Sequence, residues 1–224
     1  MLRMGRVAPM DREDTSPADT GPVRERADSR RKRLRLVAAA RLVVAERGLD
    51  AGVAEIAARA EVGVGTLYRR FGSREALVKD ILLDGIAEIR SVVDRALSEP
   101  DPWVGLTLFL SEFSKAQTAN RGLYEFTAGE ASALSPELHD DTMRLRHAVQ
   151  EVVDRAHRAG ALRGDVTWRD IVVLSLASVH ASTCLGVKAT DSQPERTAAI
   201  LLAGLRADDG AFQLPGEPPN DLLV

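Results

Sequence analysis

Apolar side chains recur every three or four positions along most of this chain, which is the spacing of one face of an α-helix. Two stretches show the period most clearly, at residues 28–48 and 73–98. The first carries Leu36, Val37, Ala40, Val43 and Val44, and the second carries Leu77, Ile81, Leu82, Ile86, Ile89, Val93 and Leu97. Runs of β-branched residues that would predict strands are scarce. The pattern therefore predicts an all-α protein.

Start and stop signals divide the remainder into further helices. A capping side chain followed by proline, or by an acid three residues later, marks a helix start. These signals are Asp101-Pro102, Ser135-Pro136, the pair Thr167 and Asp170, and Pro194. One helix is expected over 168–187, and glycines at 48 and 160 are expected to end two others. The count is about nine helices, with no strand and no repeat.

The same pattern predicts the limits of the folded units. Residues 1–27 are rich in Asp, Pro, Ser, Thr and Arg without period, so we expect a disordered arm. Residues 28–79 and 80–207 are expected to form two helical units. The tail over 208–224 is rich in Pro and Gly and is expected to be disordered.

Charge separates the two units. Residues 24–79 hold fourteen Lys/Arg against seven Asp/Glu, whereas residues 80–224 hold thirteen against twenty-two. A basic N-terminal third joined to an acidic remainder is expected when one end of a protein binds a polyanion. Solvation of a helical surface by arginines is the alternative explanation.

Several classes of protein are disfavoured. The single cysteine, Cys184, leaves no internal disulfide and too few thiolates for a structural zinc site. The first residues lack the apolar stretch of a signal peptide. The longest apolar run, 171–187, is short and polar for a membrane span. We expect a cytoplasmic protein without membrane contact, metal or cofactor.

The stretch EVGVGTLYRRF, residues 61–71, has the outline of a helix-turn-helix. A short helix, VAEIAARA at 53–60, precedes it, and four residues including glycine separate the two helices. Such a unit places its second helix in the major groove of DNA. With Leu67 and Phe71 turned inward, Gly65, Thr66, Arg69 and Arg70 share the other face, beside Tyr68 at its edge.

These residue types suit contact with DNA. Gly65 permits close approach of the backbone, and hydroxyls such as those of Thr66 and Tyr68 donate to phosphate oxygens. Arg69 or Arg70 could read guanine O6 and N7 with two parallel hydrogen bonds. A surface turn in a helical bundle, with Tyr68 half-buried, is the alternative.

The run VVAERGLDAGVAEIAARAEVGVGTLYRRFGSREALV resembles the DNA-binding domain of the TetR (tetracycline-repressor) family of bacterial regulators. The resemblance is strong from about Ser29 to Lys79, and GVGTLYRRF followed by SREALV is its most specific part. Beyond Lys79 only the helix count, the long fourth helix and the pattern AGALRGDVTWRD are similar to the family. The resemblance implies a dimeric repressor that a small ligand releases from a pseudo-palindromic operator in double-stranded DNA.

The resemblance also implies DNA-contacting positions. Backbone N–H groups, phosphate contacts and base contacts would come from Gly52, Val53, Val64, Gly65, Thr66, Tyr68, Arg69, Arg70 and Arg74, with Arg74 holding a phosphate. The basic segment RERADSRRKRLR upstream would either follow the phosphates or enter a minor groove, or would only solvate the helix start.

Four positions depart from the usual pattern of the family. Glu61 stands where a glycine is usual, and a left-handed backbone there would cost about 1 kcal/mol. Gly52 replaces a Ser/Thr cap, Arg70 replaces a frequent histidine, and Gly72 replaces a common proline. The DNA-binding interpretation survives these changes.

The second unit is expected to bind an effector and a second copy of the chain. Candidate pocket residues are Trp103, Phe109, Phe113, Tyr124, Phe126, Met143 and His180, with Trp168 and Cys184 nearby, although aromatic residues at helical spacing usually belong to the core. In the family the last two long helices of each subunit form a four-helix dimer interface, which would place it at 171–187 and 196–205.

Two other functions are open to this sequence. His147, Glu151 and Asp154 share one helix face and could bind a metal or support acid–base catalysis, although a solvated charged face explains them more simply. No phosphate loop or nucleophile elbow is present, so we expect no enzyme. A TetR-like interaction protein without DNA affinity is the other alternative, which Gly52 and Glu61 weakly favour.

Overall fold

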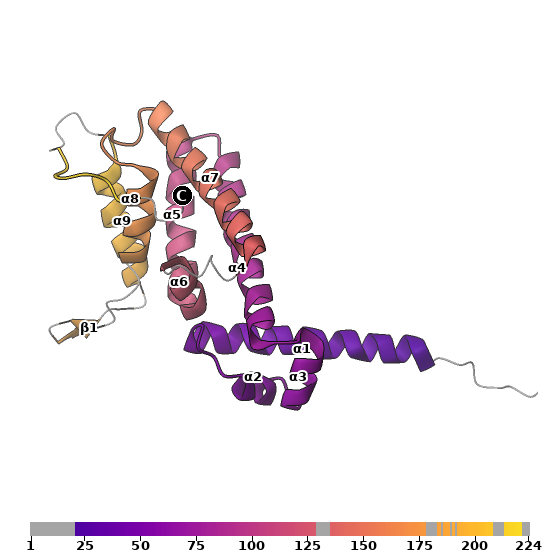
Figure 1. Ribbon diagram of the computed structural model, residues 1–224. Helices are drawn as coiled ribbons and strands as arrows, with labels where there is room; N and C mark the ends of the chain where they lie inside the picture. Colours follow the sequence, from indigo (N-terminus) through magenta and orange to yellow (C-terminus); the bar gives the residue numbers. More distant parts are fainter. Residues whose placement is uncertain are drawn as a thin grey trace, which may run out of the picture.

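The computed structural model describes residues 21–128, 135–177, 183–184, 186–188, 190, 192–207 and 213–220. Nine α-helices form over these residues, so the prediction of an all-α fold is confirmed (Figure 1). They are α1 (Gly21–Arg47), α2 (Val53–Arg59), α3 (Val64–Phe71), α4 (Arg74–Ser98), α5 (Pro102–Ala119), α6 (Arg121–Ala128), α7 (Pro136–Arg158), α8 (Trp168–Ala177) and α9 (Gln193–Leu205).

The first three helices and the start of α4 form a small unit at one end of the molecule. In Figure 1, α1 lies across the base of the larger bundle, with α2 and α3 on its far side. Their shared core consists of Leu36, Ala39, Ala40, Val43, Val44, Ala51, Ile56, Ala60, Leu67, Leu77 and Ile81. Leu36, Val43, Ile56 and Leu67 are fully buried, as the helical period predicts.

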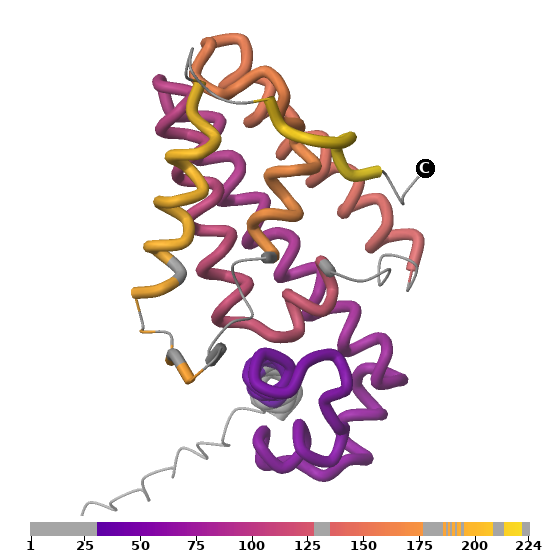
Figure 2. The backbone as a smooth tube through the Cα atoms, turned by 90° about the vertical axis from the view of Figure 1, so that its left-hand side faces the viewer, coloured from indigo at the N-terminus to yellow at the C-terminus, as the bar shows by residue number. Residues whose placement is uncertain are grey.

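The larger unit is a bundle in which α4, α5 and α7 pack together and α8 and α9 cover one side (Figure 2). Its core includes Phe109 and Phe113, whose rings stack with centroids 5.4 Å apart. Arg155 on α7 donates to the carbonyl oxygens of Leu97 and Glu99, the latter at 2.8 Å. Arg155 therefore satisfies carbonyls at the end of α4, which have no partner within the helix.

The predicted helix starts at three side-chain caps are confirmed. Asp101 accepts a hydrogen bond from the N–H of Trp103 at 2.8 Å, and Ser135 accepts one from the N–H of Leu138 at 3.2 Å. Thr167 and Asp170 bond reciprocally, with the N–H of Thr167 2.7 Å from the Asp170 carboxylate. Each contact satisfies a donor that the first helical turn cannot pair internally.

The predicted beginning of the first helix was wrong. α1 begins at Gly21, so residues 21–27, assigned to a disordered arm, are helical. Pro22 in the first turn fixes its own φ and lacks the N–H that a first turn would leave unpaired. Residues 1–20 of the predicted arm lie outside the described residues.

The predicted helix over 168–187 is also shorter in the structure. α8 ends at Ala177, and a short antiparallel pair follows, β1 (Thr183–Cys184) with β2 (Val187–Lys188). Gly186 has a φ of 79°, which suits the two-residue turn that joins the strands. β-Branched Thr183 and Val187 favour strand over helix. His180 lies outside the described residues.

The expected disordered tail is described in part. Residues 213–220 form neither helix nor strand and run along the bundle, where the N–H of Leu214 donates to Asp165 at 3.0 Å. Residues 208–212 and 221–224 lie outside the described part. Among the helices that the structure describes, none is long and apolar enough to cross a membrane.

A tight joint connects the two units where α6 meets the end of α1. Glu125 on α6 accepts a hydrogen bond from the N–H of Leu49 and another from Arg121, each at 2.7 Å. Gly48 ends α1 with a φ of 84°, and a Cβ there would collide with the Glu125 carboxylate. A Cβ at Gly122 would collide with Val44 on α1. The joint therefore requires glycine on both sides.

Candidate nucleic-acid interface

The helix-turn-helix is held by a small apolar contact between its two helices. Ile56 and Ala57 of α2 are buried, as is Leu67 of α3. The N–H of Val62, in the turn, donates to the carbonyl of Ala57 at 3.0 Å. Phe71, at the end of α3, packs on the same core. The predicted inward face of α3 is therefore confirmed.

The opposite face of α3 is open to solvent. Val64 and Tyr68 are 40% and 46% exposed, and Arg69 is exposed as well. Arg69 makes no hydrogen bond or ion pair with the described part of the chain. Thr66 and Arg70 are half-buried at the edges of this face. An exposed tyrosine beside a solvent-facing arginine suits a phosphate and base surface.

Gly65 has no role in the internal packing of the chain. A Cβ added at this position would meet no atom within 4 Å, and its φ lies outside the left-handed region. Glycine within a helix is less favourable than alanine by about 1 kcal/mol. The fold alone would therefore favour alanine here, and close approach of an external backbone or ligand explains glycine better.

Glu61 adopts the left-handed backbone that its position in the turn predicts. Its φ is 55°, and it is the one non-glycine residue with positive φ among the residues described. Its carboxylate pairs with Arg35 of α1 at 2.5 Å, although both side chains are more than half exposed. Sequence reasoning missed this pair, which gives the strained residue a contact across the unit.

Further ion pairs join basic residues of this unit to acidic residues on neighbouring helices. Arg33 of α1 lies 3.2 Å from Asp80 and stacks over the Phe71 ring at 5.7 Å. Arg59 of α2 donates to Glu46 of α1 at 2.6 Å. Much of the positive charge counted in this segment thus has an internal partner, whereas Arg31 on α1 and Arg69 on α3 have none in the described part of the chain.

Arg74, for which a phosphate contact was predicted, holds a loop of its own chain. Its guanidinium donates to the carbonyl oxygens of Leu49 and Ala51, the latter at 3.1 Å. These bonds position the loop before α2, whose first residues are Gly52 and Val53. Gly52 caps α2 without a side-chain bond. Phosphate contacts by Arg74 and by the α2 backbone stay predictions.

Most of the predicted effector residues that the structure describes are buried or half-buried in the bundle. Phe109, Phe113 and Phe126 are at most 6% exposed and belong to apolar cores. Trp103 is half-buried, with Arg206 stacked over its ring at 5.0 Å. The predicted residues Tyr124 and Met143 are half-buried too.

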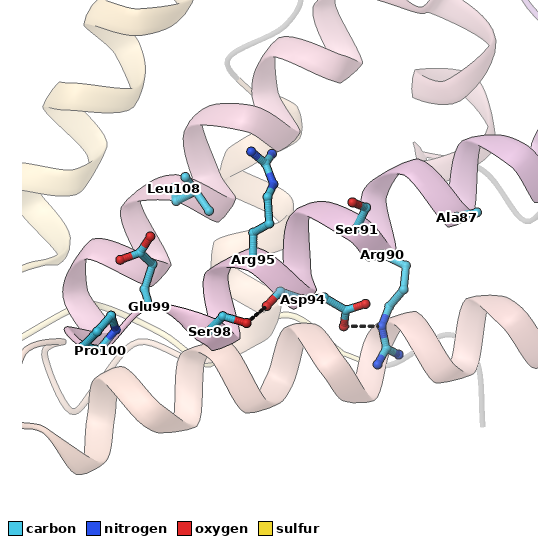
Figure 3. Close-up of a pocket in the computed structure, with 9 residues that line it drawn as sticks. All are labelled: Ala87, Arg90, Ser91, Asp94, Arg95, Ser98, Glu99, Pro100 and Leu108. Atoms are coloured by element: carbon cyan, nitrogen blue, oxygen red, sulfur yellow. Dashed lines mark hydrogen bonds and ion pairs between the residues drawn. The ribbon is translucent and has the colours of Figure 1, made fainter.

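Two hollows on the described surface lie away from these residues. One, of about 630 Å³, lies beside the end of α4, and Figure 3 shows Arg90 paired with Asp94 on its wall. The other, of about 580 Å³, lies between α8, α9 and the tail. Neither is lined by a predicted effector residue, and the assignment of these residues to an effector site stays a prediction.

The alternative of a metal or acid–base site on α7 is not supported. His147, Glu151 and Asp154 are exposed, and Glu151 pairs with Arg158 at 2.5 Å. No group of three or more His, Cys, Asp or Glu in the described ranges could hold a metal ion. A solvated charged face accounts for these residues.

Comparison with known proteins agrees with this geometry. Residues 36–81 match the family model for bacterial regulatory proteins of the tetR family, and residues 101–207 match the C-terminal domain of SbtR-like transcriptional regulators. The HTH-type transcriptional regulator AqdR of Rhodococcus erythropolis is 30% identical over 199 residues, which cover 85% of this chain and 92% of AqdR.

Solved structures share the fold. A TetR transcriptional regulator from Streptomyces coelicolor is 30% identical, with a TM-score of 0.53 over 78% of this chain and 98% of its own. A TetR regulatory protein from Mycobacterium vanbaalenii is 28% identical, with a TM-score of 0.54 over 81% and 99% of the two chains.

Replacing Glu61 with glycine should stabilise the chain slightly. The change removes left-handed strain of about 1 kcal/mol and loses an exposed ion pair worth about 0.2–1 kcal/mol. We therefore expect the free energy of unfolding, measured by urea titration, to rise by a few tenths of a kcal/mol to about 1 kcal/mol. Arg35→Ala, which removes the ion pair alone, serves as control. A fall in stability for Glu61→Gly would show that the pair outweighs the strain.

Replacing Gly65 with alanine should change stability and DNA affinity in opposite directions. The free energy of unfolding should rise by about 0.5–1 kcal/mol, whereas affinity for double-stranded DNA should fall because the Cβ obstructs approach. Urea titration and fluorescence anisotropy measure the two effects. Gly164→Ala, in the loop before α8 and also without a neighbour for its Cβ, should leave DNA affinity unchanged. Equal DNA affinity for both variants would exclude close approach at Gly65.

Proposed function

The chain belongs to the TetR family of bacterial regulatory proteins, and from that premise we propose that it is a ligand-released repressor that binds a pseudo-palindromic operator as a homodimer. The observation that carries the proposal is the exposed face of α3. It presents Val64, Tyr68 and Arg69 to solvent, while Leu67 fixes the helix to its unit. Action on chromosomal DNA would place the protein in the bacterial cytoplasm.

The proposed contacts divide into positioning and reading. Hydroxyls of Thr66 and Tyr68 would donate to phosphate oxygens and set the register of the helix. Arg69, exposed and without an internal partner, would read guanine, and Arg70 would contact the groove edge. A dimer would present two α3 helices separated by about one turn of DNA, roughly 34 Å, or a multiple of it.

Release by a ligand requires a link between the bundle and the reading unit. The joint at Glu125 supplies one, because its carboxylate holds the N–H of Leu49, three residues before the N-cap of α2. The Arg74 bonds to the same loop connect it to α4. A ligand that favours a different position of α6 would therefore change the placement of α2 and α3, and with it operator affinity.

The interior beside α6 supports an effector that donates a hydrogen bond. Gln117 is 1% exposed, and its side-chain nitrogen donates to Thr127 at 2.5 Å. Its Oε1 has no hydrogen-bond partner in the described part of the chain. A buried unpaired acceptor costs free energy that a donating ligand would recover. Phe113 lies one helical turn before it and would provide an apolar wall.

A footprint on the promoter region of the protein's own gene tests the proposal. We expect protection of a pseudo-palindrome, and a screen of small metabolites should find at least one that weakens it. Failure to bind any genomic fragment would overturn the regulator and favour a purely interacting protein. Unchanged operator affinity across a broad library would count against ligand release.

Arg69→Ala should lower affinity for the operator more than for random DNA. Loss of a contact to guanine through two hydrogen bonds removes about 1–3 kcal/mol of discrimination. The dissociation constant for random DNA divided by that for the operator should therefore fall by about tenfold or more. Fluorescence anisotropy at fixed salt measures both constants. Arg95→Ala, on α4 and distant in sequence from the reading unit, is the control. Equal losses on both DNAs would reassign Arg69 to a phosphate contact.

Glu125→Ala should loosen the joint. The N–H of Leu49 loses its acceptor, so the free energy of unfolding should fall by about 1–3 kcal/mol, and amide hydrogen exchange at Leu49 should accelerate. Glu112→Ala, at a half-buried acid of the neighbouring α5 that pairs with Arg95 and Lys115 at 3.6 Å each, should change stability by less than about 1 kcal/mol. Unchanged exchange at Leu49 would show that the joint does not hold the loop.

The hydrogen bond from the N–H of Leu49 to the Glu125 carboxylate should depend on pH in a defined way. Burial raises the pKa of Glu125, but the N–H of Leu49 and the Arg121 guanidinium outweigh burial and hold the pKa below its usual value. Its stabilisation is thus complete above the ordinary glutamate pKa and is lost as pH falls through the lowered one. The stability difference between wild type and Glu125→Ala should therefore shrink in acid.

A further inference from the structure

The C-terminal tail, α8 and α9 together enclose the hollow of about 580 Å³. Residues 213–219 of the tail form one wall, and the two helices form the others. In Figure 2 the tail crosses the outer side of α8 near its first turn, on the side of the bundle away from α4. The hollow is thus built from segments about forty residues apart in the chain.

A partly buried ion pair anchors the tail. Arg163 donates two parallel hydrogen bonds to Asp165, at 2.6 and 2.8 Å, and Asp165 also accepts the N–H of Leu214 at 3.0 Å. The Arg163 side chain is only 10% exposed. The Arg163 guanidinium and the N–H of Leu214 lower the pKa of Asp165 to about 2, so the anchor is charged at neutral pH.

The docked tail leaves the apolar face of α8 and α9 open. Val173 is 50% exposed, Ile200 is 67% exposed and Leu214 of the tail itself is 36% exposed. These are three of the eight exposed large apolar residues in the part of the chain that the structure describes, and all three line this one hollow. The tail therefore extends an exposed apolar surface instead of covering it, and such surfaces mark contact sites.

We propose that residues 213–219 form one wall of the surface on which a second copy of this chain docks, so that the tail is part of the dimer interface. The inference rests on the homodimer of the proposed function and adds to it a segment outside the helices. Glutamate and proline residues of the tail would form the rim, and Leu214 would join Val173 and Ile200 in the apolar centre.

The composition of α9 favours a second copy as the occupant. Ile200 stands beside the exposed small residues Ala199, Ala203 and Gly204. About a twofold axis, Ile200 of each copy could pack into the shallow surface that small residues leave on the other. None of these four residues is charged, and the charged residues that line the hollow, Arg163, Asp165, Asp170 and Glu217, include both signs.

The sequence of the tail reduces the conformational entropy that the tail would lose on joining an interface. Pro215, Pro218 and Pro219 restrict the backbone before any partner binds. Gly216 takes a φ of 79°, which directs the chain along the hollow. A segment that is already ordered loses less conformational entropy on association, so more of its contact energy appears as affinity.

Truncation and a point variant test this inference on the otherwise complete chain. A chain ending at Ala207 should dimerise with a dissociation constant about tenfold higher or more, measured by sedimentation equilibrium, while its helical circular dichroism stays unchanged. A chain ending at Asn220 keeps the wall and should dimerise like wild type. Leu214→Asp should weaken dimerisation in the same direction, and Gln213→Asp, which adds the same charge beside it, should weaken it less.

Three results would overturn the inference. An unchanged dissociation constant for the chain ending at Ala207 would remove the tail from the interface. A lower constant would show that the tail covers the face and competes with the second copy. If truncation unfolds the chain, equal behaviour of Leu214→Asp and Gln213→Asp would be decisive against it. A wild-type chain that stays monomeric would instead overturn the dimer of the proposed function.

Discussion

The structure depends on the burial of α4 along its whole length. Near its start, Leu77 and Ile81 complete the core of the reading unit. On an adjacent face, Val78, Leu82 and Ile86 pack with Phe126 and Leu138 of the bundle, and further along Ile89 and Val93 enter the main core. Because one continuous helix contributes to all three clusters, neither unit can shift relative to the other without a cost in buried apolar area.

Charge pairs between α1 and its neighbours supplement the apolar core that positions the reading surface. Arg33, Arg35 and Arg59 bridge α1 to acids on neighbouring segments, and each of these pairs is at least partly exposed. Exposed pairs add little stability singly. They do neutralise these three arginines, whereas Arg69 keeps an unpaired charge on the exposed face of α3 among the residues described. Glu61, the strained residue of the turn, belongs to this arrangement through Arg35.

The sequence predicted what depends on local periodicity and capping. Helix starts at Asp101, Ser135 and Thr167 were correct, because a cap and its acceptor lie within one turn of each other. The inward face of α3 followed from the same local periodicity, whereas the left-handed backbone of Glu61 was raised only as a condition of the family resemblance. The strand pair at 183–184 and 187–188 did not follow from local periodicity, because a strand of two residues is too short to show an alternating pattern.

Contacts between distant segments could not be predicted. Nothing in the order of residues shows that Arg74 binds the loop before α2, or that Glu125 meets the end of α1 seventy-six residues earlier. Aromatic residues were expected at an effector site because they are large and apolar, but the same property buries Phe109 and Phe113 in the core. Only an assembled fold distinguishes the two roles.

The joint between α1 and α6 limits how this regulator could be recombined with others. Gly48 belongs to the reading unit, whereas Gly122 and Glu125 belong to the bundle, and a side chain at either glycine would collide with the other unit. A chimera that joins this reading unit to the sensing bundle of a relative would therefore need a glycine and an acid at the matching places of its new α6. The two units have separate functions but share this one contact. Exchange between relatives is therefore restricted to bundles that carry the matching glycine and acid.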